Sequence, residues 1–208
     1  MADDLKIAFE ALAKKQAWYS TLWDYYDGRH PLVYSTEKLR EIFKGINARF
    51  SENWCAVVIG AVAERISLTR FNVTNNAIAT ARLNTLWQQT GMHLDDDEAV
   101  LSALVTGEGY IVIWAEEEVG IEAYYNDSRM CHIQYDEEHP KKKRFAAKWW
   151  VDMDGKRRMI LYYPDRVEYY ISRNKSENVQ SSKNFLEMQE PAANPWGVVP
   201  VFHLRQSR

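Results

Sequence analysis

The feature that most constrains the fold is a change in the spacing of apolar residues at Gly107. Before this glycine, apolar residues recur every three or four positions, which is the spacing of one face of an α-helix. After it, apolar residues alternate with others, which is the spacing of β-strands. Helices first and strands later predict an α+β fold. We expect a helical part over about 1–107 and a β-rich part, an antiparallel meander, over about 108–208.

The first of the predicted helices has the clearest apolar face. It ends at Gly28 and Pro31, which lack a side chain and an N–H group respectively. Ser35 is predicted to cap a second helix that Gly45 closes, and Ser51 to cap a third. The apolar face of the first helix comprises Leu5, Phe9, Leu12, Tyr19, Trp23 and Tyr26.

The rest of the helical part is predicted to hold one short strand and two helices. Residues 68–73 alternate and predict the strand. A fourth helix is expected over about 77–89, ending at Gly91. Asp95 followed by Glu98 resembles a capping box, which predicts the start of a fifth helix there.

The β-rich part begins with a segment, 109–114, that is apolar on both faces, as in a central strand. Residues 121–125 form the next predicted strand. Asp154-Gly155 is a strong hairpin signal, and Pro164-Asp165 predicts a second turn. Residues 174–183 are polar and predict a loop. One face of the strand before Asp154 is expected to carry Phe145, Ala147, Trp149 and Val151.

Charge and cysteine content narrow the possible functions. The formal net charge is -3, so the chain lacks the overall basic character of an autonomous DNA-binding domain. The 8 Trp and 12 Tyr favour a core or interface built from large rings over surfaces that stack on bases. Cys55 and Cys131 lie far apart, which fits a reducing compartment better than a disulfide framework. We expect no signal peptide and no membrane span.

No metal-binding or nucleotide-binding pattern is evident. Asp95, Asp96 and Asp97 are consecutive on a predicted helix, so they point about 100° apart and cannot converge on one ion. Cys131 and His132 adjoin on a predicted strand and face opposite ways. The chain contains neither a phosphate-binding loop nor a nucleophile elbow. We therefore expect no metal, no cofactor and no catalytic residue.

The only basic cluster is Lys141, Lys142, Lys143 and Arg144. It follows two glutamates and Pro140, which predicts a charged hairpin tip. A contact with phosphate or with a neighbouring subunit is the alternative.

Several segments of the chain, in order, resemble the portal proteins of long-tailed phages. Residues 25–31 (YYDGRHP), 53–66 (NWC through AVAERI) and 103–112 (ALVTGEGYIV) match family segments, as do 162–165 and 194–201 (NPWGVVPV). Thr106 and Glu108 replace the usual Tyr and Arg, and Trp196 replaces Leu. The resemblance assigns structural roles to Tyr26, Gly28, Arg29, Asn53, Trp54, Arg65, Gly107, Tyr110, Gly197 and Pro200.

This resemblance implies a non-enzymatic subunit of a dodecameric ring at one capsid vertex, in a virion or prophage, through which DNA enters and leaves. The chain would correspond to the wing, the amino-terminal half of such a subunit. The stem, clip, tunnel loops and crown would come from later sequence, and a truncated protein, a proteolytic product or a decayed prophage gene would each account for this. Implied partners are further copies of the chain, capsid or scaffolding protein, DNA, and, through the later regions, terminase and head-completion proteins. Assembly would take place in the host cytoplasm.

Two hypotheses from other classes stay open at this stage. A stand-alone nucleic-acid-binding module using the basic cluster and tryptophans would bind with steep salt dependence. An enzyme with a site made of scattered carboxylates would show a concave pocket with perturbed carboxyl groups.

Overall fold

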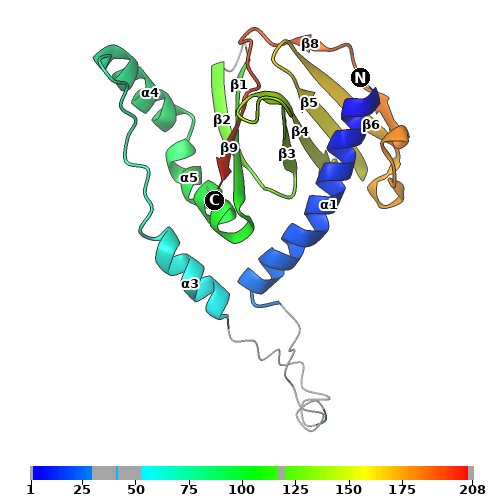
Figure 1. Cartoon of the computed structure of the whole chain (residues 1–208), viewed down its shortest axis with the longest axis horizontal. Helices are drawn as coiled ribbons and strands as arrows, with labels where there is room; N and C mark the ends of the chain where they lie inside the picture. Colours follow the sequence, from blue (N-terminus) through cyan, green and yellow to red (C-terminus); the bar gives the residue numbers. More distant parts are fainter. Residues whose placement is uncertain (1, 30–40, 42–52, 117–119, 206–208) are drawn as a thin grey trace.

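The structure is a computed structural model that describes residues 2–29, 41, 53–116 and 120–205 (Figure 1). Its α-helices are α1 (Ala2–Tyr26), α3 (Trp54–Ala63), α4 (Ala77–Gln89) and α5 (Met92–Thr106). The first strands are β1 (Glu108–Glu116), β2 (Gly120–Asn126), β3 (Cys131–Tyr135), β4 (Lys143–Val151), β5 (Lys156–Tyr162) and β6 (Arg166–Lys175). The 3-10 helices η1 (Ser176–Asn178) and η2 (Ser182–Asn184) precede β7 (Phe185–Glu187), β8 (Ala192–Ala193) and β9 (Val201–Arg205). Helices precede an antiparallel meander, so the predicted α+β class is confirmed.

Two antiparallel sheets and one long helix form the body of the molecule. The larger sheet has the order β3-β4-β5-β6-β7, with β8 also paired to β6, and the smaller has the order β2-β1-β9. The helix α1 packs on one face of the larger sheet through its predicted apolar face, including Phe9 and Leu12. The smaller sheet packs on the opposite face, where Tyr110 and Val112 of β1 meet Cys131 and other residues of the larger sheet. The larger sheet is therefore covered on both faces.

The junction at Gly107 has the predicted conformation. Gly107 has a φ of +83° and its N–H donates to the carbonyl of Ala103, so it ends α5 as a left-handed cap. The following strand β1 is the central strand of the smaller sheet, as its two apolar faces predict. The helix and strand approach closely here: a Cβ atom on Gly109 would lie 2.4 Å from the backbone oxygen of Ala99.

The meander of β4, β5 and β6 is confirmed, with Gly155 at φ +75° in the first hairpin. Phe145 and Trp149 of β4 lie in the core under α1, as expected from their shared strand face. The predicted loop at 174–183 is partly wrong, because β6 continues to Lys175 and the two 3-10 helices follow.

The predicted strand at 68–73 is wrong. This segment is extended but pairs with no strand of the part that the structure describes. Its backbone is bonded instead by side chains of α4. The amide of Asn84 accepts from the N–H of Phe71 and donates to its carbonyl, both at 2.9 Å, and the hydroxyl of Thr80 accepts from Val73 N at 2.9 Å.

Two predicted helix caps are also wrong. Asn53 rather than Ser51 caps α3, and its side-chain oxygen accepts from the N–H of Ala56 at 3.0 Å. The helix α5 starts three residues before Asp95, after a left-handed Gly91, and Met92 in its first turn is fully buried. Burial of Met92 thus outweighs the local capping preference. Apart from Glu41, which is helical, the predicted second helix with its cap at Ser35 lies outside the described residues.

Candidate functional site

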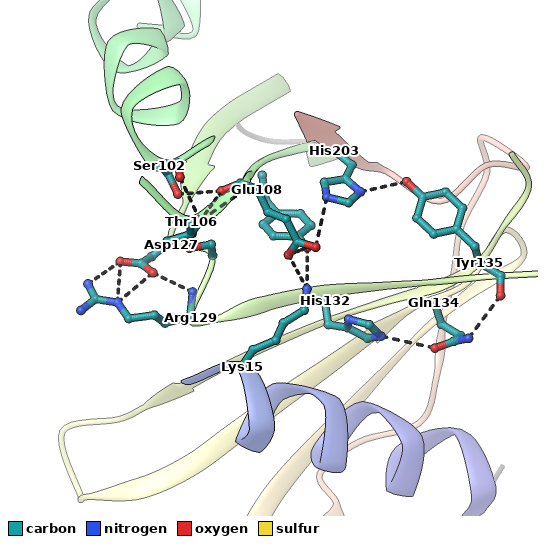
Figure 2. A network of polar contacts seen from close by, with 12 residues as sticks. Lys15, Ser102, Thr106, Glu108, Asp127, Arg129, His132, Gln134, Tyr135 and His203 are labelled. Atoms are coloured by element: carbon teal, nitrogen blue, oxygen red, sulfur yellow. Dashed lines mark hydrogen bonds and ion pairs between the residues drawn. The ribbon is translucent and has the colours of Figure 1, made fainter. Parts of the chain in front are cut away.

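A partly buried ion pair joins α1 to the smaller sheet. Lys15 lies on the apolar face of α1, between Leu12 and Tyr19, and its ammonium pairs with the carboxylate of Glu108 at the start of β1 (Figure 2). It also donates to the Tyr110 hydroxyl at 2.9 Å, and that hydroxyl donates to Glu108 Oε2 at 2.7 Å. The carboxylate therefore has two donors, Lys15 from 93 residues earlier in the chain and Tyr110 from its own strand.

Two histidines complete this polar cluster. The Nδ1 atom of His203 (β9) lies 2.9 Å from the Tyr135 hydroxyl, and its Nε2 atom lies 3.8 Å from Glu108 Oε1. The His203 ring stacks on that of Tyr110, with 4.8 Å between centroids. The Nε2 atom of His132 (β3) lies 3.3 Å from Gln134 Oε1. Within the described part of the chain, the other nitrogen of His132 and Nε2 of His203 are buried without a hydrogen-bond partner.

The surroundings set the protonation states of the cluster. Burial lowers the pKa of His203 and of His132 to about 4, so both imidazoles are neutral at pH 7. Burial also acts to raise the pKa of Glu108, but the charge of Lys15 and the hydrogen bonds outweigh it, so the pKa lies below its usual value. Burial raises the pKa of Tyr110, which stays protonated. Glu108 is thus an ionised, fully paired group, which suits a structural clamp better than acid–base catalysis.

Two of the three departures from the portal pattern, Thr106 and Glu108, have partners within the chain. Glu108 forms the ion pair just described. The Thr106 hydroxyl lies 2.9 Å from the carbonyl oxygens of Ser102 and of Glu108, and 3.0 Å from the Ser128 hydroxyl. These contacts tie the last turn of α5 to β1 and to the turn before β3 (Figure 2).

Two of the segments that carry the resemblance adjoin in space. The side chain of Asn53, besides capping α3, donates to the carbonyl of Tyr26 at 2.7 Å, at the carboxyl end of α1. Gly28 has a φ of +69°, which allows Arg29 N to bond the Asp24 carbonyl at 2.7 Å. Arg29 is paired with Asp24 and Asp27 in an exposed position. These residues form a helix–helix junction.

The last segment of the resemblance forms the approach to β9. Gly197 has a φ of +65° and Pro200 is fully buried, with its carbonyl accepting from Ile113 N at 3.0 Å. Asn194 organises this turn by donating to the carbonyls of Tyr163 and Val198, each at 2.8 Å. Two other predicted residues, Trp54 and Arg65, have exposed side chains.

The basic cluster does not form one patch at a hairpin tip. Lys141 and Lys142 lie in the turn before β4, but Lys143 and Arg144 belong to β4 itself. Lys143 donates to the Val201 carbonyl at 2.6 Å, and Arg144 pairs with Asp4 of α1. Half of the cluster is therefore used in intramolecular contacts.

Exposed apolar side chains gather on the helical arm formed by α3, the segment 64–76 and α4, which stands apart from the sheets in Figure 1. Neither helix contains a buried residue. On α3 the exposed fractions are 59% for Val57, 63% for Val58 and 46% for Val62, and on α4 the fraction is 83% for Ile78. Such a surface is typical of a protein–protein interface.

The described residues contain no group of three or more His, Cys, Asp or Glu residues placed to hold a metal ion. None of their helices is both long and apolar enough to cross a membrane. In comparisons with known proteins, no family model and no curated protein matches this chain.

Sequence reasoning missed the cluster around Glu108, although one signal was present. Lys15 falls on the apolar face of α1, three residues after Leu12 and four before Tyr19. A lysine in that position needs a buried partner or a path to water. The partner, 93 residues away, has no comparable signature in the sequence.

Proposed function

We propose that this chain is a structural subunit, or the amino-terminal part of one, of a phage portal ring through which DNA is packaged and ejected. The ordered sequence segments that resemble portal proteins support this function, as does the α+β fold. Several of the resembling residues serve as helix caps and turns, which are structural roles.

The observation that carries the proposal is the exposed apolar surface of α3. This helix has ten residues, none of them charged and none buried. An isolated helix of this length is marginal in water, because helices shorter than about 12–15 residues gain too little from their own hydrogen bonds. Burial of Val57, Val58 and Val62 against a neighbouring subunit would stabilise it. A ring subunit has such neighbours on both sides.

The chemistry of the described residues supports a structural role as well. The partly buried carboxyl group of Glu108 is held by Lys15 and Tyr110 and lies near two neutral histidines. A general acid or base needs a pKa near the working pH and access to substrate. Glu108 has neither property, because its pKa is lowered and its donors occupy it.

Localisation in virus particles tests the proposal. Antibodies against this chain are applied to purified particles from the cells that encode it, and the bound antibodies are located by immunogold electron microscopy. We expect label at a single vertex and a dodecameric complement of the chain by quantitative mass spectrometry. Antibodies against the major capsid protein are the control and should label the whole shell. Particles that lack the chain, or that carry it over the whole shell, would contradict the proposed function.

A further inference from the structure

A groove lies where α1, α3 and α5 meet. It has a volume of about 450 Å³, and apolar residues such as Ile66 and Leu101 line it. Its acidic lining residues are Glu64, Asp97 and Glu98. Among the described residues, none of these three carboxylates forms an ion pair. Glu64 also caps the carboxyl end of α3, where the helix dipole adds negative potential. The groove therefore suits an occupant with both apolar and basic side chains.

The hairpin between β4 and β5 presents a rigid apolar tip. Met153 is fully exposed there, and Val151 beside it is 50% exposed. The carboxylate of Asp152 accepts from Asp154 N at 3.1 Å and from Lys156 N at 2.9 Å, which fixes the turn. A methionine on a fixed turn can enter a groove with little loss of backbone entropy, and its flexible thioether adapts to irregular apolar surfaces.

The tip itself carries two acidic residues: Asp152, which pairs with Arg158 at 2.9 Å, and the exposed Asp154. Basic residues lie next to the tip, on β5 and β6. Lys156 lies directly opposite Lys175 in the β5–β6 register, a like-charge pair that destabilises a sheet. Arg157 and Arg173 lie close by on the same two strands. In the part of the chain that the structure describes, none of the four forms an ion pair. An acidic partner would relieve the repulsion between them.

We propose that the acidic groove of one copy of the chain receives the β4–β5 hairpin tip of a second copy. Met153 enters the apolar part of the groove, and Lys156 and Lys175 face Asp97 and Glu98. Because the two surfaces differ, the contact is heterologous and repeats head to tail, as a ring requires. This inference rests on the proposed function, since it names a contact between neighbouring ring subunits.

Disulfide trapping between two variants, each with one exposed cysteine, tests the contact. Both variants carry Cys55→Ser, because Cys55 is exposed, whereas the buried Cys131 is left in place. One adds Met153→Cys and the other Ile66→Cys. The matched control replaces the second variant by Leu186→Cys, whose side chain is 44% exposed against 42% for Ile66 and lies outside the groove. We expect the groove pair to give several times more mixed disulfide dimer than the control pair. Equal yields would overturn the proposed contact.

Charge reversal provides a second, independent measurement. We expect Lys156→Glu with Lys175→Glu to weaken self-association about fivefold in sedimentation velocity at low salt, the size expected for two exposed ion pairs. Adding Asp97→Lys with Glu98→Lys should restore it, and a failure to restore it would count against the contact. Particles that lack the chain would refute the portal function while leaving this self-association intact. Equal cross-linking would refute the contact and leave the portal function standing.

Discussion

Replacement of Gly109 by alanine tests the close approach of α5 and β1. The added Cβ atom would lie 2.4 Å from the carbonyl oxygen of Ala99, about 1 Å closer than an ordinary contact. The φ angle of Gly109 is not positive, so alanine adopts this backbone conformation without strain and the whole cost is steric. Because the obstacle is helix backbone, either the helix or the strand must move. We expect a loss of about 1–3 kcal/mol in the free energy of unfolding, the range for overpacked sites.

Two other glycines provide controls for this substitution. Gly107→Val adds no contact within 4 Å of the new Cβ, but it forces a β-branched residue to adopt a φ of +83°. We expect that strain to cost about 1–3 kcal/mol. Gly60 lies inside α3 with open space around it, so Gly60→Ala should stabilise the chain by about 0.5–1 kcal/mol through helix propensity.

Urea unfolding followed by circular dichroism measures all three variants against the parent protein. A change in the midpoint at constant slope reports the change in stability. If the free energy of unfolding of Gly109→Ala is within about 0.5 kcal/mol of that of the parent protein, the close packing of α5 on β1 is wrong. If Gly107→Val leaves the unfolding midpoint unchanged, the left-handed cap at Gly107 is wrong, and the resemblance over residues 103–112 loses its structural support.

The remaining predictions concern the polar cluster, activity and assembly. Lys15→Met leaves the partly buried Glu108 without its cation, so we expect the free energy of unfolding in urea to fall by about 1–3 kcal/mol, less than for a fully buried pair, and an unchanged midpoint would contradict the ion pair. The pKa of His203 is about 4 in the folded protein and about 6.5 in the unfolded chain, so the unfolded state binds more protons between these pH values. The free energy of unfolding therefore falls as the pH drops from about 6.5 to about 4, by at most about 3 kcal/mol. His132 contributes over the same window, so His203→Gln should reduce the slope of the pH–stability curve there without abolishing it. The exposed control His139→Gln should leave the slope unchanged, and equal slopes for His203→Gln and the parent would refute the assignment. We expect no ATP, DNA or peptide hydrolysis above a mock preparation, and turnover would oppose the structural role. The isolated chain should be monomeric or weakly self-associating at micromolar concentration by light scattering, whereas a stable dodecamer would show that these residues alone specify the ring.

The helical arm shows that the spacing of apolar residues does not by itself predict which of them are buried within the chain. The apolar spacing of α3 is that of a helix with a buried face, yet Val58 is 63% exposed and the helix buries no residue. An apolar stripe in a sequence indicates that a helix face is stabilised by burial, but it does not identify the surface that packs against that face. That information depends on neighbours in space, which local spacing does not encode.

Sequence alone determined the elements whose causes are local. The change of period at Gly107, the hairpin at Gly155 and the end of α1 at Gly28 follow from side-chain spacing and from the conformations open to glycine, and the structure has each of them. The cap expected at Asp95 was wrong because burial competes with the local preference there, and the strand expected at 68–73 was wrong because side chains of α4 bond its backbone.

Only the tertiary structure decided which distant groups meet. Asn53 caps one helix and bonds the end of another, 27 residues earlier in the chain. Lys15 pairs with Glu108 because α1 packs across the larger sheet and passes close to the start of β1, which directly follows α5. A buried charge requires a partner, but the identity of that partner depends on how the two sheets pack, which is set by the whole apolar core.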